Sequence, residues 1–574
     1  MARRLWSAGI FDLLWVLVCV CASSLWCVMA ARHLGPTFDE PFYISAGLTR
    51  WHTGSHKGLV SVGTMPLPAD VATVSIYLWE SFNGVTLDPV EDLEVLLPWA
   101  RAGTLVFWWI LLWYGWRSGR ELAGPWGGRL AVAFLACEPC LLGHASLATT
   151  DIAVSACLLA LVYHFRTERD SGWLRRVGLV SFWYGAAIAA KASALLFGPL
   201  CLGIVELERL ARAGVFRSVV GQPEGPGHFW KTKVRARLGQ MPALLSDSAR
   251  DLLQIFGLGL LIVSIYCSDG RHPTRHLNAA DLGLPEGPAS RIGIWLVEHL
   301  RSPENAYRGL SIQFKHNAEH GGTYLLGESH RSSVWYYFPV ALSIKLSLPL
   351  LIITILLACR NPRALLNWAC LSAAGLLVFS PLYRVQIGVR FVLPLVALGV
   401  VGLAAGLIRT WNASTVSWTR TALAGGVGVG IFWTAAAAMA VWPDGLCYTN
   451  ALWGGTDHGY RYLSDSNYDW GQGLKELTRW QRRRGIDWVN VWYFGTDPAL
   501  KKLNLRIVPL DTVAVHGPED FLVRMRGPYL AASTTMLYGM TSTAPAAVFL
   551  RQCQPVARTS TFFIYELQRR PDDL

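Results

Sequence analysis

The sequence predicts an all-α bundle of about eleven membrane-spanning helices, followed by a small α/β domain. Of the 574 residues, 52% are hydrophobic and only 16% are charged, whereas soluble domains carry about 25% charged residues. Apolar segments of spanning length recur through residues 1–442, and the composition then changes. We therefore expect two domains, a transmembrane domain over 1–442 and an extracytoplasmic α/β domain over 443–574.

The apolar segments that predict the bundle lie at 8–31, 99–116, 129–143, 149–166, 176–190, 193–207, 250–267, 335–358, 365–381, 387–408 and 421–442. The first begins after Arg3 and Arg4, as a secretory signal would. Its apolar region is too long for such a signal and lacks a clear small-residue cleavage site. We therefore interpret it as a retained first span.

Charge in the connecting segments predicts the orientation of these spans. The segments expected inside the cell are basic and contain, among others, Arg117, Arg120, Arg129, Arg166, Arg169, Arg175, Arg176, Arg360, Arg363, Arg409 and Arg420. The first outer loop, 32–98, has eight acids and three bases. Basic loops stay on the cytoplasmic side, so we expect a multi-pass cell (inner) membrane protein with a cytoplasmic N-terminus and an extracytoplasmic C-terminus.

The net charge of +12 is explained by this placement, because basic loops also contact anionic lipid. We therefore expect the lipid bilayer as a partner and no nucleic acid. Two outer segments, 32–98 and 268–334, are too long for simple connections, and the first is expected to contain amphipathic helices on the membrane surface. Cys447 and Cys553 can form a disulfide if the C-terminal segment lies outside.

Ionisable residues gather at the predicted outer face of the bundle. They are Asp39 and Glu40 after the first span, His144 and Asp151 around the start of segment 149–166, Lys191 between two spans, and Arg384 and Arg390 near the start of segment 387–408. Lys345 lies about ten residues into segment 335–358, or ~15 Å below the surface at 1.5 Å per residue. Ionisable groups at such depth usually face a cavity.

Carboxylates and cations in this arrangement fit one kind of reaction. A carboxylate can remove a proton from an acceptor hydroxyl. Lysine and arginine can stabilise a departing phosphate, arginine through paired hydrogen bonds and lysine as a point charge. If that phosphate is attached to a polyprenyl chain, the site must lie at the membrane boundary beside an apolar groove.

Six segments together resemble bacterial GT-C glycosyltransferases related to protein O-mannosyltransferases and the lipid A aminoarabinose transferase. They are "TFDEPFY", "HASLATTD", "AKASALLFGP", "YYFPVALSIKLSLPL", "IGVRFVLP" and "YLSDSNYDWGQGLKEL". The resemblance implies a GT-C membrane fold with the active site between the first outer loop and the membrane. It also implies an inverting transfer of a sugar from a polyprenyl-phosphate donor to a hydroxyl.

In this resemblance Asp39 is the candidate base, Glu40 supports it or the acceptor, and Asp151 matches a second acidic position. Lys191 matches a cation near the lipid phosphate, and we group Arg390, Lys345 and Arg384 with it. Tyr43, His144, Asp469, Trp470 and Gln472 are candidate sugar or acceptor contacts. Met65, in "TMPLPAD", stands where relatives often have a polar residue, which leaves the acceptor contacts and any metal site open. No cofactor is required by these residues, and a divalent metal is compatible with them.

Each candidate also has a structural interpretation. Asp39 and Glu40 can form a solvated loop, Asp151 can cap a helix, and Lys191 and Lys345 can extend toward the interface. The turn-forming segment "SDSNYDWGQ" can bind a sugar through Asp465, Asn467, Asp469, Trp470 and Gln472, or can simply join the two domains. A transporter or flippase is the alternative function, although the sequence shows no repeated halves, and an inactive membrane scaffold is a third. The acceptor can be a protein, a lipid or a polysaccharide.

Overall fold

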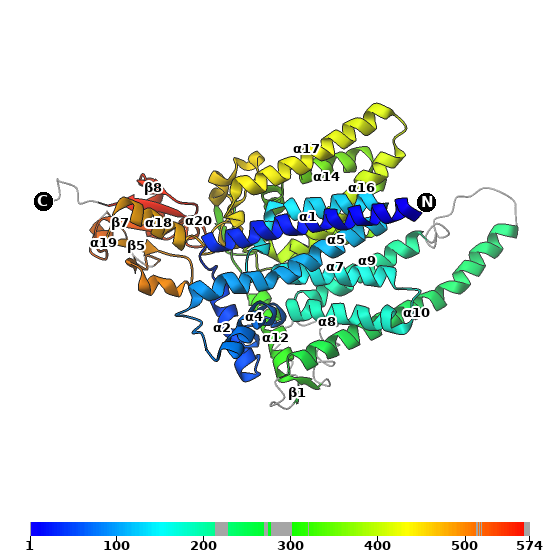
Figure 1. The fold of residues 1–574 in the computed structure, drawn as a ribbon, viewed down its shortest axis with the longest axis horizontal. Coiled ribbons are helices and arrows are strands. Elements are labelled where there is room, and N and C mark those ends of the chain that lie inside the picture. Colours follow the sequence, from blue (N-terminus) through cyan, green and yellow to red (C-terminus); the bar gives the residue numbers. More distant parts are fainter. Residues whose placement is uncertain are drawn as a thin grey trace.

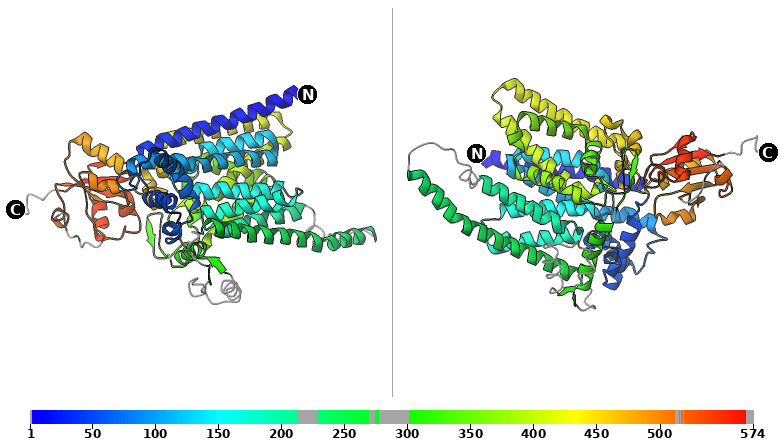
Figure 2. Two further views of the ribbon diagram at one scale, coloured as in Figure 1. Left: turned by 60° about the horizontal axis from the view of Figure 1, so that its bottom comes forward. Right: turned by 180° about the vertical axis from the view of Figure 1, so that it is seen from behind.

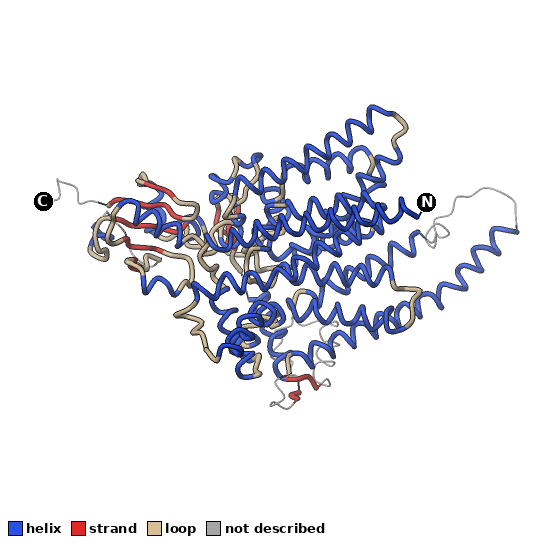
Figure 3. The backbone as a smooth tube through the Cα atoms, in the orientation of Figure 1, coloured by secondary structure: helices blue, strands red, loops and turns tan. Residues whose placement is uncertain are grey.

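The computed structural model describes residues 2–212, 228–268, 274–276, 301–319, 321–511, 515, 517 and 519–567. Long helices run side by side in a bundle, and a small mixed sheet lies beyond one end of it (Figure 1). The amino-terminal end of the first helix lies at the opposite end of the bundle from the sheet. Helices dominate the described chain, and most strands belong to that terminal sheet (Figure 3).

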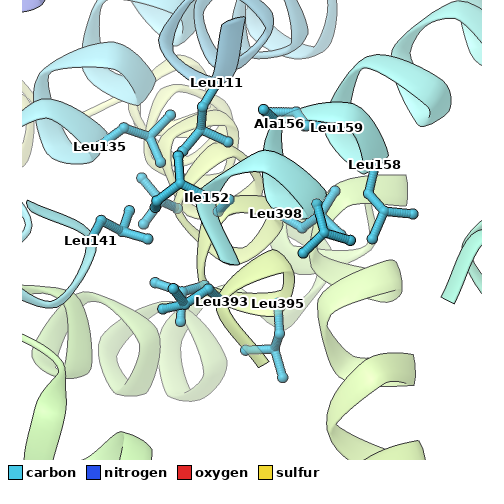
Figure 4. Close-up of a cluster of buried hydrophobic side chains, with 14 of the residues drawn as sticks. Leu111, Leu135, Leu141, Ile152, Ala156, Leu158, Leu159, Leu393, Leu395 and Leu398 are labelled. Atoms are coloured by element: carbon cyan, nitrogen blue, oxygen red, sulfur yellow. The ribbon is translucent and has the colours of Figure 1, made fainter. Parts of the chain in front are cut away.

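The bundle contains the helices α1 (Ala2–His33), α5 (Leu93–Cys137), α6 (Pro139–Ala145), α7 (Asp151–Thr167), α8 (Val180–Ala190), α9 (Ala194–Arg212), α10 (His228–Tyr266), α13 (Tyr337–Lys345), α14 (Leu348–Arg360), α15 (Trp368–Phe379), α16 (Leu393–Ala413) and α17 (Ser417–Val441). Its centre lies where α5, α6, α7 and α16 meet. Leu111 and Leu135 of α5, Leu141 of α6, and Ile152 and Leu398 are buried there together (Figure 4).

Helix α5 is a hairpin of two antiparallel arms. Ala123 and Gly124 have non-helical backbone angles, with φ of −149° and +75°, and Pro125 follows them. A Cβ on Gly119 or on Gly127 would collide with the carbonyl oxygen of the other glycine, although eight residues of straight helix span about 12 Å. The two predicted segments 99–116 and 129–143 therefore correspond to two arms that reverse direction, as separate spans would.

Five of the described helices are long and apolar enough to cross a membrane, and a sixth results if the bent pair α13–α14 counts as one span. The structure thus supports a multi-pass membrane protein, but not the count of eleven. Helix α5 counts once although it has two arms, and α7, α8 and α15 are shorter than a full span. Since α7 is buried on nearly all sides, its neighbours, rather than lipid, provide its apolar surroundings.

The predicted continuous span 335–358 is wrong. Helix α13 ends at Lys345, and α14 begins at Leu348 after a bend of 118°. Ser347 is extended at the break, and Pro349 lies in the first turn of α14, where proline is favoured because its missing N–H is not needed. Lys345 therefore lies at a helix end and not in the middle of a span.

Beside the bundle lie the helices of the outer segments, α2 (Glu40–Thr53), α3 (Lys57–Val60), α4 (Leu67–Asn83) and α12 (Glu304–Glu319). Helix α4 has exposed apolar side chains, Leu78, Trp79 and Phe82, which fits the expected amphipathic helix. In segment 268–334 the structure adds the short strand pairs β1 (Thr274–His276) with β2 (Arg301–Pro303) and β3 (Thr323–Leu325) with β4 (Glu328–His330). Residues 277–300 of that segment lie outside the described residues.

The terminal sheet has five strands in the order β6-β5-β7-β9-β8. They are β5 (Val489–Trp492), β6 (Leu505–Ile507), β7 (Tyr529–Ser533), β8 (Ala557–Arg558) and β9 (Phe562–Glu566), and β5 runs parallel to both neighbours whereas β9 is antiparallel to β7 and β8. Helix α18 (Leu474–Arg484) packs with Ala531 and Ile564 on one face, and α21 (Pro545–Gln552) packs with Leu530 and Phe563 on the other. The sheet and its helices form a small α/β unit.

The chain between α17 and α18 packs against the bundle and not only against the sheet. Leu446 and Trp470 cluster with Leu147 of the bundle, and the loop before α16 is fastened to this segment as well, because Val389 N donates to Asn467 Oδ1 over 2.9 Å. Cys447 and Cys553 are both free thiols in the structure, so the disulfide considered from the sequence is absent between these two residues. The segment 443–472 therefore connects the two predicted domains.

Candidate active site

Four of the predicted site residues lie at helix ends on the side of the bundle that faces the sheet. Asp39 is the residue before α2, Asp151 begins α7, Lys191 follows α8, and Arg390 lies in the short 3-10 helix η6 (Val389–Val392) that leads into α16. These positions are separate in sequence because each belongs to a different connection. The alternating direction of the helices brings the connections together.

Asp39 is held by two partners and keeps an accessible edge. Tyr43 Oη donates to Asp39 Oδ2 over 3.3 Å, and Arg390 Nη1 donates to the same oxygen over 3.1 Å. The Asp39 side chain remains 24% exposed. Burial and then the charge of Asp39 raise the pKa of Tyr43, so the phenol keeps its proton and acts as a donor to the carboxylate.

Asp151 and Lys191 form a second pair in the same cluster. Lys191 Nζ lies 2.6 Å from Asp151 Oδ1, and the side-chain exposures are 16% for the lysine and 0% for the aspartate. Burial lowers the pKa of Lys191, and the charge of Asp151 opposes that effect. The aspartate thus holds the ammonium group at the surface of the cavity, where the group is poorly solvated and can bind an anion.

Two aromatic rings support the cations. Lys191 Nζ lies 4.4 Å from the centre of the Phe391 ring, and the Arg390 guanidinium carbon lies 4.2 Å from the centre of the Trp470 ring. Such contacts stabilise a desolvated cation. In the described part of the chain, Arg390 Nε has no hydrogen-bond partner although it is buried. Arg390 Nε therefore has no partner among the described residues, while Nη1 of the same side chain donates to Asp39.

A cavity of about 540 Å³ opens beside these groups. Asp39, Tyr43, Lys191 and Arg390 belong to its polar lining, together with Thr64, Thr150, Ser193, Gln313, His316 and Asn317. The rest of the lining includes many apolar and aromatic side chains, among them Met65, Leu196, Phe379, Leu382, Tyr383 and Phe391. The cavity therefore offers one carboxylate and two cations at one place and an apolar wall beside them.

Glu40 is next to Asp39 in sequence but does not reach the cavity. Its carboxylate accepts hydrogen bonds from Thr37 N (2.8 Å), Thr37 Oγ1 (3.0 Å), Ala148 N (2.8 Å) and two nitrogens of Arg101, Nε at 2.7 Å and Nη2 at 2.6 Å. Burial alone would raise the pKa of Glu40, but the Arg101 charge and these hydrogen bonds hold it below its usual value. Glu40 thus lies in the scaffold next to Asp39, where it fixes the surrounding backbone, and its carboxylate is not exposed to the cavity.

Arg101 completes this scaffold and was missed in the sequence. Its Nη1 donates to the carbonyl of Ala31 over 3.0 Å and its Nη2 donates to that of Gly35 over 2.7 Å, so it ties the end of α1 to α5. An arginine two residues inside an expected span, 99–116, is itself an indication of function or of a buried partner. That signal could have identified it.

Lys345, expected among the phosphate ligands, lies away from the cavity and is bonded to the backbone. Its ammonium group donates to the carbonyl oxygens of Leu446 (2.6 Å), Tyr448 and Asn467 (2.7 Å), and it does not line the cavity. An ammonium group has three hydrogens, so all are used. Arg384 lies in the loop before η6 but donates to the carbonyl of Ala318 over 3.0 Å and does not line the cavity either.

The expected sugar contacts in "SDSNYDWGQ" divide into different roles. Asp469 accepts hydrogen bonds from Ser533, Thr534 and Thr535 N, and Gln472 bonds Asp444 and the Trp470 backbone. Both are fully buried, so they join the sheet to the bundle rather than face a sugar. Trp470 contacts Arg390 with its ring, as described above.

His144 lies near the cluster and is buried. In the described chain, its Nδ1 and Asp151 Oδ2 have no hydrogen-bond partner, and it does not line the cavity. Among the described residues no group of three His, Cys, Asp or Glu side chains is arranged to hold a metal ion.

Comparisons with known proteins find likenesses in structure only. No protein-family model matches the chain, and no curated protein sequence matches it. ArnT from Cupriavidus metallidurans bound to undecaprenyl phosphate is 14% identical with a TM-score of 0.41, over 97% of this chain and 98% of that one. The apo state of the same protein is 12% identical, also with a TM-score of 0.41.

The archaeal oligosaccharyltransferase AglB from Archaeoglobus fulgidus, in complex with an inhibitory peptide and a dolichol-phosphate, is 11% identical with a TM-score of 0.44. That alignment covers 97% of this chain and 75% of AglB. The likenesses are distant, and the geometry of the site carries the functional conclusion.

Proposed function

We propose that this protein transfers a sugar from a polyprenyl-phosphate donor to an acceptor hydroxyl at the extracytoplasmic face of the membrane. The observation that carries this proposal is the cavity in which Asp39, Lys191 and Arg390 share one polar end and apolar side chains form the adjoining wall. A lipid-linked sugar phosphate has matching parts, because an anionic group joins a long apolar chain to a hydroxyl-rich ring.

Asp39 is suited to the role of general base. Its Oδ2 is engaged by Tyr43 and Arg390, and no described group donates to Oδ1. A carboxylate with a free oxygen on the cavity can accept the proton of an acceptor hydroxyl, and such general bases contribute roughly 10²- to 10⁴-fold to rate. Arg390 fixes the orientation of this carboxylate through its hydrogen bond to Oδ2.

The transfer is a single displacement in this proposal. The acceptor oxygen loses its proton to Asp39 and forms a bond to the anomeric carbon, while the bond from that carbon to the phosphate oxygen breaks. The phosphate leaves with the electron pair and remains attached to the polyprenyl chain. One displacement inverts the configuration at the anomeric carbon, so an inverting stereochemistry follows from the proposed role of Asp39.

Lys191 and Arg390 bind the phosphate before and after this step. Lys191 has N–H donors beyond the one directed at Asp151, and Arg390 has a free Nε. Phe391 and Trp470 keep water from these cations, which strengthens their interaction with a developing negative charge. The apolar wall that contains Leu196, Phe379 and Leu382 is placed to contact the first prenyl units.

The orientation is part of the proposal. The basic connections of the sequence favour a cytoplasmic N-terminus, and the N-terminus lies at the end of the bundle remote from the sheet (Figure 1). The site and the sheet then face the extracytoplasmic side. A lipid-linked donor suits that side because nucleotide sugars are absent there.

The test is a transfer assay with the purified full-length protein in lipid nanodiscs. Labelled undecaprenyl-phosphate sugars are supplied in turn with a membrane extract as the source of acceptors. We expect the wild type to transfer one of them and Asp39→Asn to lose about 10²- to 10⁴-fold of the rate. Asp457→Asn is the matched control, because it removes the same charge at an exposed position.

A second comparison tests the phosphate ligands separately. Binding of sugar-free undecaprenyl phosphate should fall in Lys191→Met and stay unchanged in Lys57→Met, which alters an exposed lysine on α3. Normal transfer by Asp39→Asn would contradict the role of Asp39. Movement of the lipid across the bilayer without any transfer would instead indicate the flippase.

A further inference from the structure

A second, smaller cavity adjoins the first. It measures about 80 Å³, and Ile387 lines both cavities. Its polar lining includes Thr323, Gln386, Ser464, Asp465, Thr535 and Thr541, and the rest of the lining is aromatic, methionine and Ile387 side chains. A single water needs roughly 10–15 Å³ of such volume, so about five to eight non-hydrogen atoms fit. That is part of a sugar ring and less than a whole one.

The turn that carries Asp465 is fastened to the loop that carries Arg390. Ser466 Oγ donates to the carbonyl of Ile387 over 2.8 Å, and Val389 N donates to Asn467 Oδ1 over 2.9 Å. Gly388 lies so close to Ser466 that a Cβ on the glycine would collide with the serine hydroxyl. Asp465 is therefore held in a fixed position beside the loop that carries Arg390, although the two segments are far apart in sequence.

The backbone of Asp465 is unusual for a residue with a side chain. Its φ is +56°, a left-handed conformation that glycine adopts freely and that asparagine and aspartate tolerate better than other residues. Its N–H donates to Thr535 Oγ1 over 3.0 Å. Glycine or asparagine could adopt the same backbone conformation. The shape of the turn therefore does not explain why an ionisable side chain lies here.

One oxygen of the Asp465 carboxyl group remains available. Oδ1 accepts a hydrogen bond from Ser466 N over 2.6 Å, whereas no group in the described residues donates to Oδ2, and Asp465 lines the cavity. Burial raises the pKa of this carboxyl group to about 7, against the opposing charge of Arg390. Near neutral pH the group can therefore both donate to and accept from a hydroxyl.

We propose that the smaller cavity is a subsite for a sugar hydroxyl and that Asp465 binds this hydroxyl and selects for it. The proposal rests on the proposed function, because the larger cavity must hold the phosphate from which the sugar extends. Asp39 and Asp465 both interact with Arg390, so the subsite adjoins the place where the sugar would be attached to phosphate. The hydroxyl belongs either to the transferred sugar or to a sugar acceptor.

The first test compares Asp465→Asn with Asp457→Asn in the full-length protein, using the donor that the wild type transfers. Asparagine tolerates the same φ and is nearly the same size, so the turn should be preserved. We expect the KM for the partner that bears the hydroxyl to rise about tenfold or more, as the loss of a hydrogen bond to a charged group would cause. Binding of sugar-free undecaprenyl phosphate should not change.

Deoxy analogues of the donor sugar, each lacking one ring hydroxyl, identify the group that Asp465 binds. In the wild type one analogue should be transferred at least tenfold less efficiently than the donor, and in Asp465→Asn that analogue and the donor should be transferred equally. Alternatively, Asp465→Asn could raise only the KM for the acceptor, while the wild type transfers every donor analogue as efficiently as the donor. That result would place the hydroxyl on a sugar acceptor. Equal kinetics of Asp465→Asn and Asp457→Asn with all substrates would overturn the proposal.

A measurement without turnover separates this proposal from the proposed function. The carbonyl stretch of the protonated Asp465 carboxyl group should appear in infrared difference spectra of the wild type and be absent from Asp465→Asn. We expect this band to shift when methyl glycosides of the common hexoses and pentoses are added in turn. If the band shifts with none of these sugars, the cavity holds only water and the proposed subsite is wrong. This conclusion would hold whether or not the protein transfers sugar.

Discussion

Replacing Glu40 by glutamine should destabilise the protein rather than remove a catalytic group. Glu40 and Arg101 are buried with side-chain exposures of 0% and 1%, and their closest nitrogen–oxygen distance is 2.6 Å. Five hydrogen bonds converge on the carboxylate from Thr37, Ala148 and Arg101. The substitution leaves the guanidinium group buried without a counter-charge.

Breaking a buried ion pair by removing one partner costs about 3–5 kcal/mol. At 1.4 kcal/mol per factor of ten, the ratio of folded to unfolded protein should fall by roughly two to three and a half orders of magnitude. Glu40→Gln should therefore melt at a markedly lower temperature in detergent than the wild type does. Asp39→Asn, next to it in sequence, should lower the melting temperature less, because the Asp39 side chain is 24% exposed and has two partners instead of five hydrogen bonds.

The double variant Glu40→Gln/Arg101→Met distinguishes pairing from any separate role of Glu40. If Glu40→Gln loses stability because the Arg101 guanidinium group is left unpaired, removing Arg101 as well should recover part of that stability. The transfer rate per folded molecule should remain within a few-fold of wild type in Glu40→Gln. A normal melting temperature together with abolished transfer would refute the scaffold role and return Glu40 to the reaction.

Three further predictions concern the packing of the segment between α17 and α18. Lys345→Met leaves three carbonyl oxygens without their donor and should lower stability by about 1–3 kcal/mol in a melting assay, while the folded fraction binds undecaprenyl phosphate normally. Gly445→Ala should destabilise by a similar ~1–3 kcal/mol, because its Cβ would lie 2.6 Å from Gly143 Cα; an unchanged melting temperature would contradict this packing. Burial raises the pKa of Asp444 to about 6, so the stability linked to its proton is present at low pH and lost as the pH rises through 6. The melting temperature should therefore fall less between pH 4.5 and 7.5 in Asp444→Asn than in the wild type, and equal falls would show that Asp444 does not titrate in this range.

The clustering of four candidate residues could be predicted from the sequence because each of them lies at a helix end. Asp39, Asp151, Lys191 and Arg390 each border an apolar segment, and alternating segments place such borders on one side of a membrane. The sequence also predicts the two arms of α5 as separate segments, 99–116 and 129–143, because polar and basic residues interrupt the apolar pattern between them. What the pattern cannot give is the pairing within the cluster, which depends on the direction of each side chain.

The sequence misplaces Lys345 because the apolar run 335–358 predicts one continuous helix. Pro349 lies four residues after Lys345, and proline inside a helix breaks the hydrogen-bond ladder. Depth calculated at 1.5 Å per residue therefore had no meaning there. The proline could have indicated the break, but the three carbonyl partners of Lys345 lie about 100 residues or more further along the chain.

The segment "SDSNYDWGQ" shows a similar limit. Its polar residues predict sugar contacts. The Asp469 carboxylate instead accepts hydrogen bonds from hydroxyl and amide groups near the end of β7, more than 60 residues away. Asp465 instead keeps one carboxylate oxygen for a cavity. Residue type and spacing cannot distinguish these two aspartates, because the difference lies in which distant segment folds against each of them.

The most direct test of the proposed site is a structure of the full-length protein with undecaprenyl phosphate, determined by electron cryomicroscopy in nanodiscs. The phosphate should lie between Lys191 Nζ and the free edge of the Arg390 guanidinium group, with the first prenyl units along Leu196, Phe379 and Leu382. Asp39 should face the open side of the phosphate. A lipid bound elsewhere, with this cavity filled by water alone, would contradict the proposed site.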